Sequence, residues 1–172
     1  MSDLFDKVTS DQDPFTKILG KIPGFKGYIE RTSRRSADKI LREQITTAFS
    51  EIWKRVGNIQ SDMASSGEFM YLDDIETAAT KLQTFIDKVS GAAYGYSGFF
   101  DAIKVNEEEL AKIYEFDAAL LDGADEISRA VDNIESSLGT DGLPAAIRHL
   151  VGLTRDLVTV FDKRDLVLTE IS

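Results

Sequence analysis

The side chains that most often carry enzyme chemistry are scarce in this chain. It contains no cysteine and a single histidine, His149. No serine pairs with that histidine at a suggestive spacing, and no glycine-rich phosphate loop precedes a helix. A ferritin-type di-iron site needs a Glu-x-x-His motif on two helices, which one histidine cannot supply. We therefore expect no enzyme, no metal site and no cofactor, with His149, which follows Arg148, at the surface rather than on a haem.

Asp117 is the polar residue in the most unusual position. It falls within an apolar series that runs from Leu110 to Leu138 at alternating steps of three and four residues. A carboxylate at such a position costs free energy unless it is paired or hydrogen-bonded. The simpler interpretation is a buried polar residue that specifies helix register. The alternative is a polar anchor for a ligand, with Tyr96 and Tyr114 as neighbours.

Apolar residues at helical spacing define the elements that would position these side chains. The clearest series is Leu72, Ile75, Ala79, Leu82, Ile86, Val89, Ala93, Tyr96 and Phe100. This spacing keeps one stripe of a helix against a partner. Similar series predict long helices over about 28–65, 70–103 and 107–138, and a fourth that starts near Pro144.

The breaks between these series carry turn chemistry. Ser65-Ser66-Gly67 and Gly139-Thr140-Asp141-Gly142 are the predicted turns between helices. Gly91, Gly95 and Gly98 lower the helix propensity of the second series, but the apolar spacing continues through them. We therefore expect the second helix to extend to about residue 103.

The fold class follows from four long helices in a chain of 172 residues, which is long enough for one core. We predict an all-α fold: an antiparallel up-down four-helix bundle of long helices with a short N-terminal amphipathic helix. The predicted divisions are an N-terminal segment, 1–27, and a bundle domain, 28–172. The competing arrangement is an extended helical hairpin that buries its apolar stripes only when copies associate.

An up-down bundle would gather aromatic and basic residues from distant parts of the sequence at one end. The candidate partner-binding residues are Phe25, Tyr28, Arg31, Arg34, Arg35, Tyr94, Tyr96, Phe99 and Phe100. One interpretation is an aromatic plug that closes the end of the core. The other is a recognition surface, because tyrosine combines apolar area with a polar tip.

Charge is distributed unevenly along the chain. Residues 15–56 carry ten basic and four acidic side chains, whereas residues 57–172 carry nine basic and twenty-two acidic ones. Arg31, Arg34 and Arg35 could therefore pair with Glu107–Glu109, or face an anionic partner, either an acidic protein or a membrane surface. The net charge of -10 argues against nucleic acid.

The N-terminal segment alternates apolar residues with lysines. Phe15, Ile18, Leu19 and Ile22 share one face of a short predicted helix that either folds back on the bundle or lies in a lipid interface. The chain has neither an export signal nor an apolar run of about 20 residues. We expect a cytoplasmic protein, with a peripheral place at the inner membrane face as the alternative.

Two short stretches carry a resemblance to other proteins. Residues 21–31, KIPGFKGYIER, and 94–102, YGYSGFFDA, resemble an uncharacterised bacterial family of helical proteins. The resemblance covers most of the chain and implies no activity and no binding residues. A fainter similarity, in helix length and in the amphipathic start, is to phage-shock-type membrane-stress scaffolds.

These observations lead to three functional hypotheses. The first is a non-enzymatic protein-interaction or adaptor module that presents its aromatic and basic end to a protein partner. The second is a peripheral membrane scaffold that binds anionic lipid through residues 14–42. The third is a carrier of a small ligand in the mouth of the bundle. The identity of any partner and the formation of a homo-oligomer stay open.

Overall fold

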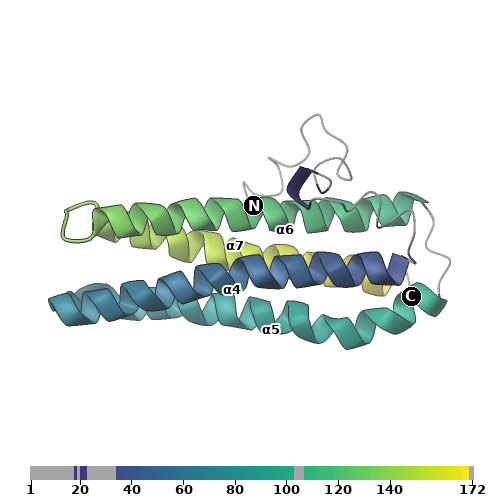
Figure 1. Ribbon diagram of the computed structural model, residues 1–172, viewed down its shortest axis with the longest axis horizontal. Coiled ribbons are helices and arrows are strands. Elements are labelled where there is room, and N and C mark those ends of the chain that lie inside the picture. The colour runs from purple at the N-terminus through teal and green to yellow at the C-terminus, as the bar shows by residue number, and fades with distance from the viewer. Residues whose placement is uncertain (1–17, 19, 23–33, 103–106, 171–172) are drawn as a thin grey trace.

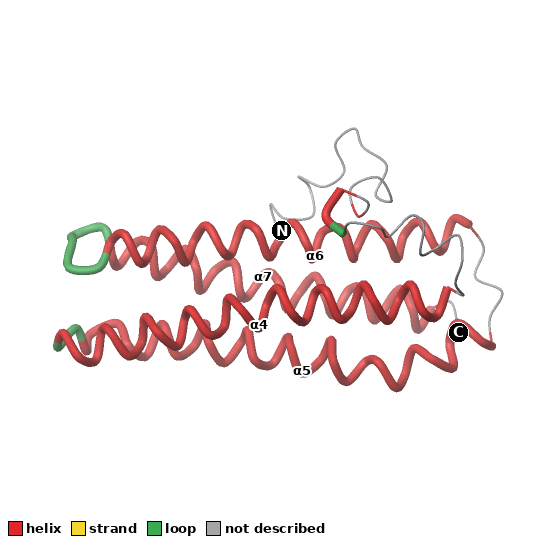
Figure 2. Tube along the Cα trace, viewed as in Figure 1, coloured by secondary structure: helices red, strands yellow, loops and turns green. Residues whose placement is uncertain are grey.

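The computed structural model describes residues 18, 20–22, 34–102 and 107–170, with side chains described at 18, 20–22, 40–91 and 115–163. Within these residues the chain is helical and contains no strand, so the predicted all-α class is confirmed (Figures 1 and 2). The elements are α4 (Arg34–Ser66), the 3₁₀ helix η1 (Phe69–Tyr71), α5 (Leu72–Ala102), α6 (Glu107–Ser137) and α7 (Leu143–Glu170). None of the described helices is both long and apolar enough to cross a bilayer.

The α4–α5 turn forms where the sequence predicts a break. Gly67 adopts a φ of 82°, a left-handed conformation that glycine reaches without strain. Its amide donates to the carbonyl of Ala64 at 3.4 Å, and the amide of Glu68 donates to the carbonyl of Met63 at 2.9 Å. This pair of bonds is the Schellman motif, which satisfies carbonyls left free at a helix end. α4 therefore ends at Ser66.

The α6–α7 turn uses a second glycine in the same way. Gly139 has a φ of 73° and follows the end of α6. The amide and the hydroxyl of Thr140 both donate to the carbonyl of Ser137, at 3.0 and 2.7 Å. Pro144 is the second residue of α7, a position where a missing amide hydrogen costs little. The backbone of α5 stays helical through Gly91, Gly95 and Gly98, as the apolar spacing predicts.

The four helices form two hairpins that lie against each other. α4 contacts α5, and α6 contacts α7; between the hairpins, α4 contacts α6 and α5 contacts α7. Figure 1 shows both tight turns at one end of the molecule, with the starts of α4 and α6 and the ends of α5 and α7 at the other. The neighbours α4 and α6 therefore run in parallel, as do α5 and α7.

The core combines aliphatic stripes with an aromatic cluster. Phe49, Phe85 and Phe161 come from α4, α5 and α7, with ring centroids 4.6 Å apart for the first pair and 5.6 Å for the second. Both pairs adopt the edge-to-face geometry that aromatic rings prefer. Trp53 follows Phe49 by four residues, a spacing that would widen the apolar stripe of α4, but it is 39% exposed, because its position lies off the buried face.

Part of the N-terminal segment packs on α6. Ile18 and Ile22 are buried in the core, while Gly20 and Lys21 lie at its edge. Residues 116–121 of α6 are all buried, and Lys21 pairs with Asp122, the next residue along that helix. The other residues of the predicted amphipathic helix, including Phe15 and Leu19, lie outside the described residues, so the helix itself stays a prediction.

Candidate functional site

The predicted partner-binding end is described only through its backbone. Arg34 and Arg35 begin α4, and the last turns of α5 contain Tyr94, Tyr96, Phe99 and Phe100. The helix ends that carry these residues lie at the same end of the molecule in Figure 1. The side chains of these six residues lie outside the described part of the chain. Phe25, Tyr28 and Arg31 lie outside it altogether, so the grouping of these residues into one surface stays a prediction.

Asp117 is buried, as its place in the apolar series predicts, with 1% of its surface exposed. Arg42 on α4 is also buried, with 8% exposed. Arg55 of α4 contacts residues 128–135 of α6. Because the two helices run in parallel, a step of thirteen residues back along both of them places Arg42 level with residues 115–122, the range that contains Asp117. Opposite charges therefore lie at one level of the core, an arrangement that lowers the cost of burying either of them.

The remaining candidates for chemistry are two tyrosines, the single histidine and the ligands of a metal site. Tyr96 and Tyr114, the predicted neighbours of Asp117, have side chains outside the described residues. His149 is exposed on α7, as predicted. Among the residues whose side chains are described, no three histidine or carboxylate side chains are grouped as a metal site would require.

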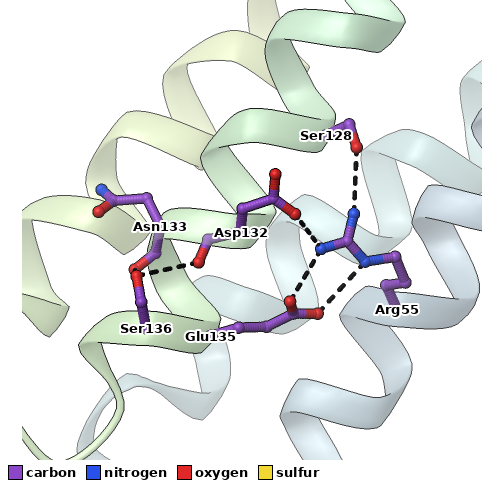
Figure 3. Close-up of polar contacts among 6 residues, drawn as sticks. All are labelled: Arg55, Ser128, Asp132, Asn133, Glu135 and Ser136. Carbon is purple, nitrogen blue, oxygen red and sulfur yellow. Dashed lines mark hydrogen bonds and ion pairs between the residues drawn. The ribbon is translucent and has the colours of Figure 1, made fainter.

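Arg55 forms several polar contacts between the two hairpins (Figure 3). Its guanidinium donates to both carboxylate oxygens of Glu135, at 3.2 and 2.9 Å, and to the hydroxyl of Ser128 at 3.0 Å. It also forms an ion pair with Asp132. The pKa of Arg55 is raised above its ordinary value, chiefly by the hydrogen bond to Glu135 and despite desolvation. Such a two-pronged contact fixes the position of α4 along α6.

Lys21 ties the N-terminal segment to the same helix. Its ammonium pairs with Asp122 at 2.9 Å and with Asp125. Desolvation lowers the pKa of Lys21, but the hydrogen bonds and charges of Asp125 and Asp122 more than offset it, so the pKa is raised. On the other side of the molecule, Lys88 of α5 pairs with Asp162 of α7 at 2.7 Å.

These contacts bear on the uneven charge of the sequence. Lys21 and Arg55 both belong to the basic stretch 15–56, and both pair with carboxylates of α6. Part of the positive charge therefore neutralises the acidic helices within the molecule. Sequence reasoning missed these pairs, although Ser128, Asp132 and Glu135 recur at steps of four and three residues along one face of α6.

The end formed by the two turns has a feature that sequence reasoning did not identify. Phe69 and Met70 in η1 are 65% and 81% exposed. We call Glu68, Phe69 and Met70 the apolar tip. Arg55 of α4 and Asp132 of α6 form an ion pair and therefore lie at the same level of the bundle. Beyond this level α4 continues for six residues more than α6, which is about 9 Å. The apolar tip therefore lies at the extremity of the molecule. The signal in the sequence is two large apolar residues directly after a turn glycine.

The apolar tip is surrounded by negative charge. Residues 56–80 and 136–147, which form this end, contain no lysine, arginine or histidine. The acidic residues in these two ranges are Asp62, Glu68, Asp73, Asp74, Glu76 and Asp141. All are exposed except Glu68, which is half-buried. This end thus has the opposite charge to the arginines that begin α4.

The comparisons with known proteins supply no identity. No family model matches the chain, and neither a curated protein nor a solved structure matches it. The resemblance carried by residues 21–31 and 94–102 therefore stays a prediction, and function has to be argued from the residues alone.

Proposed function

We propose that the chain is a cytoplasmic, non-enzymatic protein-interaction module, built on an antiparallel up-down four-helix bundle, that presents an aromatic and basic end to an acidic protein partner. The observation that supports this most directly is the course of the backbone. The start of α4 and the end of α5 lie at one end of the molecule, although residues 34 and 100 are far apart in sequence (Figure 1). Arginine and tyrosine are enriched where proteins bind one another.

The start of α4 favours an anionic ligand for an electrostatic reason. The amino end of a helix carries partial positive charge, and α4 begins with two arginines and no acidic residue in its first turn. Positive charge is therefore concentrated there without compensation from its own first turn. Glu107 and its two neighbours begin α6 at the same end and are the intramolecular competitors for these arginines. An acidic partner would have to compete with these carboxylates for the arginines.

The N-terminal segment favours a protein partner over a lipid surface. Ile18 and Ile22, two of the four apolar residues that would enter a bilayer, are buried against the helices. Lys21, which would face anionic headgroups, is held by Asp122 and Asp125. Membrane binding through this face would require the segment to leave the core.

Affinity capture from a lysate of the source cell tests this function. We expect the native chain to retain a defined partner and Arg34→Glu/Arg35→Glu to lose it. Glutamate suits the first turn of a helix, so this variant keeps its fold. Arg148→Glu, a charge reversal at an exposed position on α7, is the matched control and should retain the partner. Equal retention by both variants, or no partner with the native chain, contradicts the proposal.

Flotation with anionic vesicles separates the lipid hypothesis from this one. We expect the native chain to stay at the bottom of the gradient with vesicles of anionic and neutral phospholipid. Co-flotation that is lost in Lys17→Glu/Lys26→Glu would instead favour the membrane scaffold and would contradict the proposed module.

A further inference from the structure

We propose that the apolar tip is a docking surface for a basic segment of another protein, one in which lysine or arginine side chains flank a large apolar side chain. This inference goes beyond the function proposed above, because it assigns a second partner, of opposite charge, to the opposite end of the molecule. It does not involve the arginines that begin α4.

The apolar part of this surface is a pair of adjacent side chains that the core does not use. Phe69 is 65% exposed and Met70 is 81% exposed, whereas the next two residues, Tyr71 and Leu72, pack partly against the core. Residues 139–142, the exposed part of the α6–α7 turn, are glycine, threonine and aspartate. A turn at this end therefore does not require exposed apolar residues. An aromatic ring beside a methionine is typical of a surface that binds another protein.

The carboxylates at this end are exposed and are not neutralised within the described part of the chain. Among the described residues, none of the five exposed carboxylates forms an ion pair. They are Asp62, Asp73, Asp74, Glu76 and Asp141. Carboxylates along the bundle differ, because Asp122, Glu135 and Asp162 each pair with a lysine or an arginine of another element. Negative charge is therefore left uncompensated around the apolar pair.

Two of these carboxylates are not explained by the helices that carry them. Asp73 and Asp74 lie in the first turn of α5, where negative charge stabilises a helix. Asp62 lies near the carboxyl end of α4, where negative charge is unfavourable. Neither Asp62 nor Glu76 has a lysine or an arginine three or four residues away on its own helix. A basic partner accounts for both.

The sign of the charge selects among the possible occupants. An anionic lipid surface or a nucleic acid would be repelled by these carboxylates. A second copy of this chain has a net charge of -10 and brings more carboxylates than cations. Residues 1–17 of the same copy contain four acidic and two basic side chains, so they lack the charge to cover the apolar tip. A basic segment of another protein matches the carboxylates, and its apolar side chain matches the exposed pair.

The chemistry of the contact sets its strength. Two apolar side chains make a small interface, so the partner should bind weakly and dissociate quickly. The carboxylates are exposed, so their attraction for the partner should fall as salt is added.

Fluorescence anisotropy of a labelled synthetic peptide with lysine and leucine at helical spacing, titrated with the full chain at low and high sodium chloride, tests the inference. We expect the native chain to bind this peptide, and to bind it more weakly at high salt. A peptide of the same charge with serine in place of leucine should bind about tenfold more weakly. A peptide of glutamate and leucine should not bind.

Substitutions in the apolar pair test whether the peptide docks at the tip. Phe69→Ser/Met70→Ser should weaken binding of the lysine–leucine peptide by about tenfold. Trp53→Ser is the control, because it removes an apolar side chain that is 39% exposed on α4 away from the turn. This variant should bind like the native chain.

Matched charge variants separate a local contact from general attraction to an acidic protein. Asp62→Asn/Glu76→Gln should weaken binding by about threefold at low salt. Glu51→Gln/Asp87→Asn removes the same number of charges from exposed positions on the same two helices. Each of these positions lies eleven residues further from the turn, about 16 Å, so this variant should bind like the native chain.

The methionines report the place of binding directly. Met70 is 81% exposed and Met63 is 0% exposed, and the chain has only three methionines. With methyl-labelled methionine, the NMR signal assigned to Met70 through Met70→Leu should shift as the peptide is added. The signal of Met63 should stay in place, because its side chain is enclosed in the core.

Several results would overturn the inference. They are no binding by the native chain, unchanged binding by Phe69→Ser/Met70→Ser, an equal loss in the two charge variants, and an unshifted Met70 signal. Flotation with anionic vesicles, or self-association in sedimentation velocity, that is lost in Phe69→Ser/Met70→Ser would overturn it in favour of lipid or a second copy. The proposed function survives all these results, because its test depends on Arg34 and Arg35 at the opposite end.

Discussion

The α4–α5 turn and the α6–α7 turn lie at the same end of the molecule, and each uses a glycine with a positive φ, 82° at Gly67 and 73° at Gly139. Both turns reverse the direction of the chain within a few residues after a long helix. Their surfaces differ: one exposes Phe69 and Met70, whereas Leu138 in the other is partly buried against the core and Leu143, which begins α7, is 4% exposed. The exposed pair is therefore a property of the sequence at that turn and not a requirement of helix reversal.

This comparison depends on both hairpins belonging to one cooperative core, and Phe85→Ala tests that most strongly. Phe85 is fully buried between Phe49 and Phe161, so its removal leaves a cavity shared by both hairpins. We expect a loss of about 3–5 kcal/mol in the free energy of unfolding, measured by urea denaturation. Hydrogen exchange should speed up in both hairpins together. Faster exchange confined to α4 and α5 would mean that the hairpins unfold separately.

The equivalence of the two turn backbones is tested by replacing each glycine. Gly67→Ala and Gly139→Ala should each lower the free energy of unfolding by about 1–2 kcal/mol, because an added Cβ strains a left-handed residue. Space is not the cause, since the nearest atom to a new Cβ is 4.0 Å away at Gly67 and none lies within 4 Å at Gly139.

Gly57→Ala is the matched control for this pair. Gly57 lies in the middle of α4, exposed and with open space around it, so alanine there should stabilise the protein by about 0.5–1 kcal/mol. A large difference between the two turn variants would show that the turns are not equivalent in backbone strain.

The backbone conformation of the two turns could be predicted from the sequence, whereas the difference between their surfaces could not. Gly67 and Gly139 indicate the positions of the two turns, and apolar spacing predicts the helices that these turns join. Periodicity reports which face of a helix is buried, and it succeeds at Ile75, Leu82 and Ile127. It fails at Trp53, whose exposure depends on how wide a stripe the neighbouring helices cover.

The same limit explains what was missed at the candidate surfaces. The ion pairs of Lys21 and Arg55 depend on which helices are neighbours, and spacing along one helix contains no information about the parallel contact of α4 with α6. Phe69 and Met70 lie in a turn, outside any periodic series. Asp117 was found because a carboxylate interrupts a pattern, a signal that is local to one helix.

The relative position of the two turns along the molecule is set by the contact of α4 with α6, and a double-mutant cycle on Arg55 and Glu135 measures it. The Arg55 side chain is 31% exposed and that of Glu135 is 44% exposed, so solvent screens the pair. We expect a coupling free energy of about 0.5–1 kcal/mol that falls as salt is added. The more exposed pair Lys88–Asp162 should couple more weakly. A coupling free energy of zero between Arg55 and Glu135 would show that this contact does not determine the register of α4 along α6.

Phe69→Ser has the smallest expected effect on stability, and its comparison with Leu143→Ser distinguishes the two turns. Phe69→Ser should change the free energy of unfolding by less than about 0.5 kcal/mol, because the side chain is 65% exposed and the fold gains little from it. Leu143→Ser, at the buried first residue of α7 directly after the other turn, should cost several times more, since it removes packing and buries a hydroxyl. Urea denaturation of both variants makes the measurement. If Phe69→Ser destabilised the protein as much as Leu143→Ser, Phe69 would contribute to the fold despite its exposure, and the two turns would not differ in this respect.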